Sequence, residues 1–401
     1  MAGVSSSRLV GLDLARLVAL LGMVAAHLLT GVVDGRVTLT HQVVAGRSSG
    51  LFALLAGLAI VLLARTREPV RGLAWRAEQA AALARAVGLG ALGLLLGGLV
   101  DTGMSVILAY YAVLFALATP FLALRTRWIA LAAGVLVLVG PPLSQVLRSV
   151  LPRDRPSDPT PASLLDPLDL LQELLLTGSF PVLTWLPFVL AGMVVGRLDL
   201  RSVDVTRRLT AVGAGLVLLA WVAADLFLAV PGVREQLERS VARPGGPADL
   251  ELILSRGFKA VLPTDTWAWL LVRAPHSGAW LDQVNVIGSS CLVIGLCLAV
   301  GRRVPERLVV LTGAGSLTLT LYTLHVVSRD RGLVPVDGPD QLLPQVLVML
   351  ALGALAHRLG RRGPLEAVLT RMSRAARAAV VVAVPEAEPD VPGVTVRGGR
   401  G

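Results

Sequence analysis

The first apolar segment, Leu9 to Val32, is long enough to cross a bilayer and yet carries three ionisable side chains: Asp13, Arg16 and His27. An Asp or Arg at the centre of a membrane helix costs about 2.5 to 3.5 kcal/mol, so such residues usually face protein or water. At about 100° per residue, Arg16 and His27 fall within roughly 20° of each other, and Asp13 within about 60° of Arg16. We therefore expect one side of this helix to face the protein interior, where Asp13 and Arg16 form a structural ion pair or line a binding site.

The composition is typical of a polytopic membrane protein. Hydrophobic residues make up 54% of the 401 residues, charged residues 16%, and the mean hydropathy is +0.72. The net charge of +10 does not indicate a nucleic-acid partner, because the arginines are dispersed between apolar runs without interleaved aromatic residues. Cys291 and Cys297 lie on different faces of one run, so they cannot bridge each other, and the sequence has no metal-ligand spacing. We expect no metal.

Ten apolar runs approach the ~20 residues that a bilayer requires, which predicts an all-α transmembrane helical bundle of about ten spans. The arginine-rich loops all fall on one side of this arrangement. By the positive-inside rule that side is the cytoplasm, so both termini lie inside a cell whose plasma membrane holds the protein. The expected spans are Leu9 to Val32, Gly50 to Ala64, Ala84 to Val100, Met104 to Leu124, Trp128 to Val146, Pro181 to Val195, Leu209 to Val230, Val284 to Val300, Leu308 to Val327 and Leu342 to Ala356.

The segments outside these spans define the expected domain organisation. Two long loops on the outer side, Arg148 to Ser179 and Pro231 to Gln283, are able to roof an outward cavity. The second loop contains Trp267, Trp269 and Trp280, which we interpret as interface anchors. We assign residues 1–366 to the integral membrane domain and residues 367–401 to a basic and then disordered cytoplasmic tail.

Histidines are the strongest candidates for catalytic residues, because the chain has only five of them and four are expected on the outer side. By the topology above, His27, His41, His276 and His325 lie there. A neutral imidazole can take a proton from an attacking amine or hydroxyl, which is what acyl transfer requires. The alternative for each is an interfacial or hydrogen-bonded histidine without a catalytic part.

The ninth span adds hydroxyl groups to this set. Thr318, Tyr322 and His325 follow an i, i+4, i+7 spacing on one face. Such hydroxyls either bond helix to helix or line a cavity that ends at the histidine. Tyr110 in the fourth span and Asp101 at its outer mouth are weaker candidates of the same kind.

Several segments together resemble the catalytic-domain family of heparan-alpha-glucosaminide N-acetyltransferase, and most closely its bacterial relatives of unassigned function. The resemblance spans nearly the whole chain. The segments that carry it are Gly11-Leu12-Asp13-Leu14-Ala15-Arg16, Gly22-Met23-Val24-Ala25-Ala26-His27, Gly46-Arg47-Ser48-Ser49-Gly50-Leu51-Phe52-Ala53-Leu54-Leu55-Ala56-Gly57, Leu108-Ala109-Tyr110-Tyr111, Trp185-Leu186-Pro187-Phe188, Pro275-His276-Ser277-Gly278, Leu319-Thr320-Leu321-Tyr322-Thr323-Leu324-His325 and Gly363-Pro364-Leu365-Glu366.

The resemblance implies a membrane-bound, CoA-dependent acyltransferase with acetyl-CoA as co-substrate and a glucosamine-type amine as acceptor. It also implies a histidine of the first outer loop at the reaction centre, and His41 is the matching position. His27 stands where the characterised enzyme has an asparagine. For a bacterial relative, the acceptor would be an amine or hydroxyl of a sugar or cell-envelope glycan on the outer side.

The residues themselves leave several roles open. Arg47 and Ser48 can stabilise an oxyanion, or Ser48 can simply cap a helix. Cytoplasmic arginines can hold CoA phosphates, although the positive-inside rule explains them without a ligand. A transporter or flippase for a cell-envelope precursor is the alternative function, with the same polar faces lining a path. The expected partners are the bilayer and a small-molecule or glycan acceptor, while a homodimer is left open.

Overall fold

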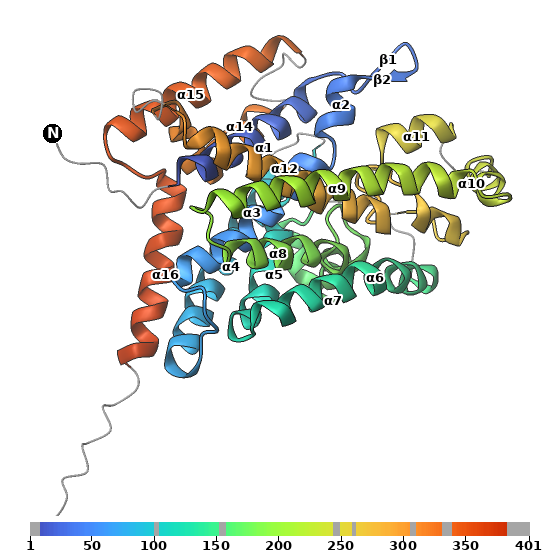
Figure 1. Cartoon of the computed structure of the whole chain (residues 1–401). Helices are drawn as coiled ribbons and strands as arrows, with labels where there is room; N and C mark the ends of the chain where they lie inside the picture. Colours follow the sequence, from blue (N-terminus) through green and yellow to red (C-terminus); the bar gives the residue numbers. More distant parts are fainter. Residues whose placement is uncertain are drawn as a thin grey trace, which may run out of the picture.

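The fold is a bundle of α-helices (Figure 1). The computed structural model describes residues 9–99, 104–151, 158–243, 249–258, 262–304, 310–330 and 339–382. Within these ranges the only sheet is a hairpin of β1 (Val32–Val33) and β2 (Arg36–Val37), in which Val32 pairs with Val37. The protein is therefore nearly all-α, as the apolar runs predicted.

The described residues form fifteen α-helices, which differ widely in length. They are α1 (Val10–Leu28), α2 (Leu39–Val44), α3 (Arg47–Ala64), α4 (Gly72–Leu99), α5 (Leu108–Ala118), α6 (Thr126–Val150), α7 (Pro167–Gln172), α8 (Val182–Gly196), α9 (Val203–Leu228), α10 (Val233–Val241), α11 (Leu250–Arg256), α12 (Trp280–Gly301), α14 (Thr318–Ser328), α15 (Leu342–Arg358) and α16 (Pro364–Val382).

The described residues include seven helices long and apolar enough to cross a membrane. The number rises to eight if α8 and the helical segment before it, Pro167–Thr177, which meet at a 60° bend, form one broken span. The expected count of ten is thus not confirmed. The apolar helix Leu108–Ala123 is too short to meet the same criterion, and α14 has only 11 residues.

The ninth expected span, Leu308 to Val327, is not one continuous helix. A 3-10 segment covers Val310–Ser316, and α14 begins at Thr318. Two glycines bring neighbouring backbones against this segment: a Cβ on Gly315 would lie 1.9 Å from the Asp13 carbonyl oxygen, and one on Gly313 would lie 2.1 Å from that of Gly353. Only residues without a side chain permit such an approach. The segment therefore seats α1 and α15 beside the start of α14.

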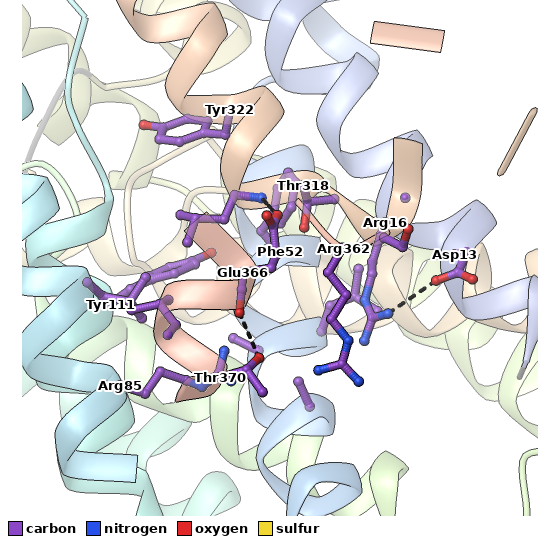
Figure 2. A pocket seen from close by; sticks show the side chains of 18 of the residues that line it. Asp13, Arg16, Phe52, Arg85, Tyr111, Thr318, Tyr322, Arg362, Glu366 and Thr370 are labelled. Atoms are coloured by element: carbon purple, nitrogen blue, oxygen red, sulfur yellow. Dashed lines mark hydrogen bonds and ion pairs between the residues drawn. The ribbon is translucent and has the colours of Figure 1, made fainter. Parts of the chain in front are cut away.

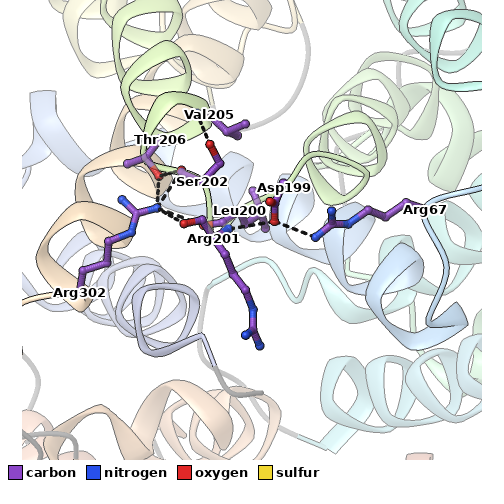
Figure 3. Close-up of polar contacts among 8 residues, drawn as sticks. All are labelled: Arg67, Asp199, Leu200, Arg201, Ser202, Val205, Thr206 and Arg302. Atoms are coloured by element: carbon purple, nitrogen blue, oxygen red, sulfur yellow. Dashed lines mark hydrogen bonds and ion pairs between the residues drawn. The ribbon is translucent and has the colours of Figure 1, made fainter. Parts of the chain in front are cut away.

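Several arginine-rich loops contact one another at one end of the bundle, which we call the basic end. At this end Arg302 reaches from the end of α12 to the turn before α9, where it donates to the carbonyl oxygens of Leu200, Arg201 and Ser202 (Figure 3). Beside it, Arg67 pairs with Asp199 at 2.9 Å (Figure 3). Some of the predicted cytoplasmic arginines thus tie loops together.

Helix α16 also lies at the basic end, across the ends of the spans (Figure 1). It packs along α4, and Arg377 forms an ion pair with Glu78 at 2.6 Å. The expected domain boundary at residue 366 falls inside this helix, so the basic segment up to Val382 packs against the spans. The expected disordered tail, Pro385 to Gly401, lies outside the described residues.

A small cap of short helices covers part of the opposite end, which we call the histidine end. Helices α10 and α11 and the turn Trp267–Leu271 share an apolar cluster around Leu237 and Trp269. Trp269 is fully buried in it and donates to Ser240, so the interpretation of this residue as an interface anchor is wrong. Trp267, in contrast, is 57% exposed.

Candidate functional site

Among the described residues, one cavity opens toward each end of the bundle. The larger, about 790 Å³, is lined by α1, α3, α4, α5, α14, α15 and α16 and belongs to the basic end. The other, about 410 Å³, belongs to the histidine end. Met23, Ile107 and Tyr322 line both cavities. The two spaces therefore approach each other at these side chains.

The polar face of α1 contributes to both cavities. Its periodicity predicted only that this face lies against protein or water. Asp13 and Arg16 line the basic-end cavity and pair at 3.3 Å, with the Asp13 side chain only 5% exposed (Figure 2). His27, further along the helix, lines the histidine-end cavity. The ion pair and the cavity position thus occur together, although the sequence presented them as alternatives.

Glu366 connects the C-terminal helix to the wall of the basic-end cavity. Its carboxylate accepts from the backbone N–H groups of Leu319 and Thr320, at 2.8 and 3.1 Å, and from the Thr320 hydroxyl. These two amides lie in the first turn of α14, where no intrahelical acceptor is available to them. A carboxylate at a helix N-terminus is also favoured by the helix dipole. Glu366 therefore fixes the start of the helix that carries Tyr322 and His325.

Guanidinium groups surround the outer part of this cavity. Arg85 and Arg362 lie around the same space as Glu366 and Arg16 (Figure 2). Both also line an adjoining space of about 270 Å³, which is strongly basic. The arginines lining the adjoining space are Arg65, Arg85, Arg362, Arg374 and Arg377. This arrangement is suited to phosphate groups, which arginine binds by paired charge-assisted hydrogen bonds.

At the histidine end, two histidines from distant parts of the chain form a pair. His27 Nδ1 lies 3.0 Å from His325 Nε2, and the rings are within 2° of parallel with centroids 5.2 Å apart. With the two nitrogens 3.0 Å apart, a centroid separation of 5.2 Å means that the rings lie edge to edge in nearly one plane. An N–H on one ring therefore points at the lone pair of the other. His325 is 1% exposed, and its Nδ1 lies 2.7 Å from Oε1 of Gln345 on α15.

His41 lies on α2 and lines the same cavity. Its Nε2 lies 2.8 Å from the carbonyl oxygen of Arg256. Because a carbonyl only accepts, Nε2 carries the hydrogen and Nδ1 keeps the lone pair. Thr38 caps the helix by accepting from the His41 backbone N–H, which places the ring at the cavity mouth.

His276 completes the group of histidines that line this cavity. Its backbone has φ of +57°, and its ring lies near those of Phe180 and Trp185, with centroids 6.0 and 6.2 Å away. Burial, followed by the electrostatic influence of His41 and Arg47, lowers the pKa of His276 to about 4. The ring is therefore neutral near pH 7.

The remaining predicted site residues divide between cavity and core. Ser48 lines the histidine-end cavity, whereas Arg47 turns back to donate to the Ala45 carbonyl and is not among the lining residues. Tyr110 is fully buried and accepts from the backbone N–H of Ser179, so it contributes to packing. Asp101 lies outside the described residues.

Sequence reasoning missed two polar residues that complete the site. Gln345 is a polar residue within an apolar run. A polar residue in such a run was also the signal that predicted a role for His27, so the same signal could have identified Gln345. Glu366 belongs to a segment that carried the family resemblance, but its carboxylate was not connected to α14. Among the described residues, no group of three or more His, Cys, Asp or Glu side chains is placed to hold a metal ion.

Comparison with known protein families gives a match over the first part of the chain. The family model described as "Heparan-alpha-glucosaminide N-acetyltransferase, catalytic" matches residues 8–231, more than half of the chain. The chain belongs to this family. The match includes His27, His41 and Ser48, while His276 and His325 lie beyond it. A search of curated proteins finds none that matches the chain. Family and helices together identify a membrane protein with an acetyltransferase-like catalytic domain.

Proposed function

We propose that the protein transfers an acetyl or related acyl group from acyl-CoA to an amine or hydroxyl of a sugar or envelope glycan on the other side of the membrane. The observation that carries this proposal is the pair of cavities that meet at Met23, Ile107 and Tyr322. A donor held at one end and an acceptor held at the other need only a short junction for the acyl group to pass.

The basic-end cavity fits the donor. CoA carries several phosphate charges, and Arg16, Arg85 and Arg362 line this cavity. Arg16 and His27 are eleven residues apart on α1, about 16 Å at 1.5 Å rise per residue, which an extended pantetheine arm can cover. The thioester would then reach the junction beside Tyr322 while the phosphates stay among the arginines.

The histidine-end cavity fits the acceptor and the proton transfer. A histidine there, His41 or His27, takes the proton of the attacking amine or hydroxyl as the new acyl bond forms. Ser48 and the backbone around it are candidates to stabilise the oxyanion, and Phe180 and Phe258 offer flat surfaces to a sugar ring.

The decisive experiment uses purified protein in nanodiscs with labelled acetyl-CoA and a panel of amino sugars and envelope glycans. Release of CoA together with label in the acceptor supports the proposal. Arg85→Gln and Arg362→Gln should raise the KM for acetyl-CoA, whereas Arg67→Gln, which removes an exposed pair at the same end, should not. Acceptor movement across a vesicle without consumption of acetyl-CoA would establish the alternative, a transporter or flippase.

The proposal also assigns the basic end, and with it both termini, to the cytoplasm of a cell whose plasma membrane holds the protein. In a background without Cys291 and Cys297, Glu238→Cys on α10, whose side chain is 53% exposed, should react with an impermeant thiol reagent added to intact cells. Arg303→Cys should react only after lysis. The reverse pattern would overturn the orientation.

A further inference from the structure

The pair His27 and His325 ends at a side chain that defines the hydrogen positions of both rings. Oε1 of Gln345 lies 2.7 Å from Nδ1 of His325, and Nε2 of His325 lies 3.0 Å from Nδ1 of His27. An amide oxygen only accepts, so Nδ1 of His325 must carry the hydrogen. In a neutral ring the other nitrogen then accepts, which requires Nδ1–H on His27. The nitrogen left with a lone pair is Nε2 of His27.

We propose that Gln345 is a positioning residue that, through His325, holds His27 with Nε2 unprotonated, and that this nitrogen is the base for acyl transfer. The proposal rests on the acyltransferase function proposed above and identifies which histidine accepts the proton. His27 lines the histidine-end cavity on the same helix face as Met23, which borders both cavities. His325 is nearly inaccessible and bonded at both nitrogens, so it acts through His27.

The geometry of His41 favours His27 as the base. Nε2 of His41 is occupied by the Arg256 carbonyl, and its Nδ1 faces Gly31, where an added Cβ would lie only 2.9 Å away. Backbone therefore approaches both ring nitrogens of His41. This arrangement is suited to a ring that shapes the cavity mouth.

The proposed step is balanced within the protein and its two substrates. The acceptor oxygen or nitrogen attacks the thioester carbon while its proton passes to Nε2 of His27. The carbon–sulfur bond then breaks, and the imidazolium returns the proton to the departing sulfur, which leaves as CoA thiol. Gln345 and the ring of His325 hold the orientation throughout, as a second group does for the base in nucleophilic triads.

The first test measures tautomers and needs no activity. In protein labelled with nitrogen-15 at histidine, His27 and His325 should give the signals of Nδ1–H rings, while His41 gives that of an Nε2–H ring. Single histidine substitutions assign the signals. In Gln345→Leu the Nδ1–H population of both rings should fall. Nε2–H signals at His27 and His325 in the wild type would overturn the proposal.

The second test measures the pH profile of acetyl transfer. Gln345→Leu should lower kcat by roughly 10-fold or more, part of the contribution of a positioned base, with the KM for acetyl-CoA unchanged. Gln345→Glu keeps the acceptor and adds a negative charge, so it should retain activity and move the acidic limb of kcat/KM to higher pH. Gln341→Leu, at the start of the same helix, is the control and should behave as wild type. Arg329, His41 and His276 border the same cavity, and all variants retain them.

The two tests separate failure of the inference from failure of the function. Wild-type kcat and an unmoved pH limb in both Gln345 variants would show that Gln345 only packs. Nδ1–H rings in a protein that never consumes acetyl-CoA would leave the arrangement intact but refute the acyltransferase function, and with it the role of His27 as base.

Discussion

Removal of the Glu366 carboxylate should destabilise the junction between α16 and α14. Its carboxylate accepts three hydrogen bonds, two of them from first-turn amides of α14. A hydrogen bond to a charged group contributes about 1.5 to 3 kcal/mol, and loss of a helix cap costs about 0.5 to 2 kcal/mol. The first turn of α14 borders the basic-end cavity, so in the variant water can hydrogen-bond to the freed amides and offset part of the lost free energy. We expect Glu366→Ala to lower the free energy of unfolding by about 3 kcal/mol.

The free energy of unfolding can be measured by titration with SDS in mixed micelles, where unfolding of helical membrane proteins is followed by circular dichroism. Glu366→Gln keeps one acceptor oxygen and should cost about 1 kcal/mol, since only the charge is lost. Glu251→Ala is the control, because it removes an exposed ion pair with Arg234 that should contribute at most about 1 kcal/mol. If Glu366→Ala costs no more than this control, the carboxylate does not fix the start of α14.

Three further predictions follow from buried groups. Reversing the charge of Asp13 or of Arg16 alone should lower the free energy of unfolding by roughly 3 to 5 kcal/mol and reduce expression. Reversing both charges should restore folding but not acyl-CoA binding. A double variant that binds acyl-CoA normally would remove the pair from the donor site. His276 has a pKa of about 4 in the folded protein, so the unfolded chain binds its proton more readily. The free energy of unfolding should therefore fall as the pH drops from about 6.5 to 4, by at most about 1.4 kcal/mol per pH unit. His276→Phe should lose this pH dependence, and an unchanged slope in that variant would contradict the prediction. Gly57→Leu should prevent α3 from packing on α8, because a Cβ would lie 1.8 Å from a carbonyl oxygen of that helix, whereas Gly134→Leu, in open space, should be tolerated in thermal unfolding assays.

Part of the site was predictable because it depends on local periodicity. The spacing of Asp13, Arg16 and His27 on one helix fixed which side of α1 faces the protein, and the structure places all three on cavity walls. Residues at helical spacing share a face whatever the rest of the chain does. In the same way, Thr318 and Tyr322 were predicted to share a polar face of α14, and both line the basic-end cavity.

Other features of the site depend on a neighbouring backbone. Arg47 and Ser48 are adjacent in sequence, yet only Ser48 lines the cavity, because the guanidinium of Arg47 finds a carbonyl acceptor nearby. Tyr110 looked like a cavity residue, but the turn at Ser179 folds over its hydroxyl. No local pattern specifies which of several acceptors a long side chain will meet.

The sequence by itself determined the class of protein, its nearly all-α fold and its family, because composition and apolar run length are summed over many residues. Only the tertiary structure decided that His27 meets His325, 298 positions along the chain, and that Gln345 completes the row. It also decided that two cavities approach each other at Tyr322. Helix periodicity sets the face of each side chain, but the partner of that face depends on which helices pack together. Which helices pack together depends on close backbone contacts between segments far apart in the sequence, such as the contact of Gly315 with Asp13. The sequence of one helix does not specify such a contact.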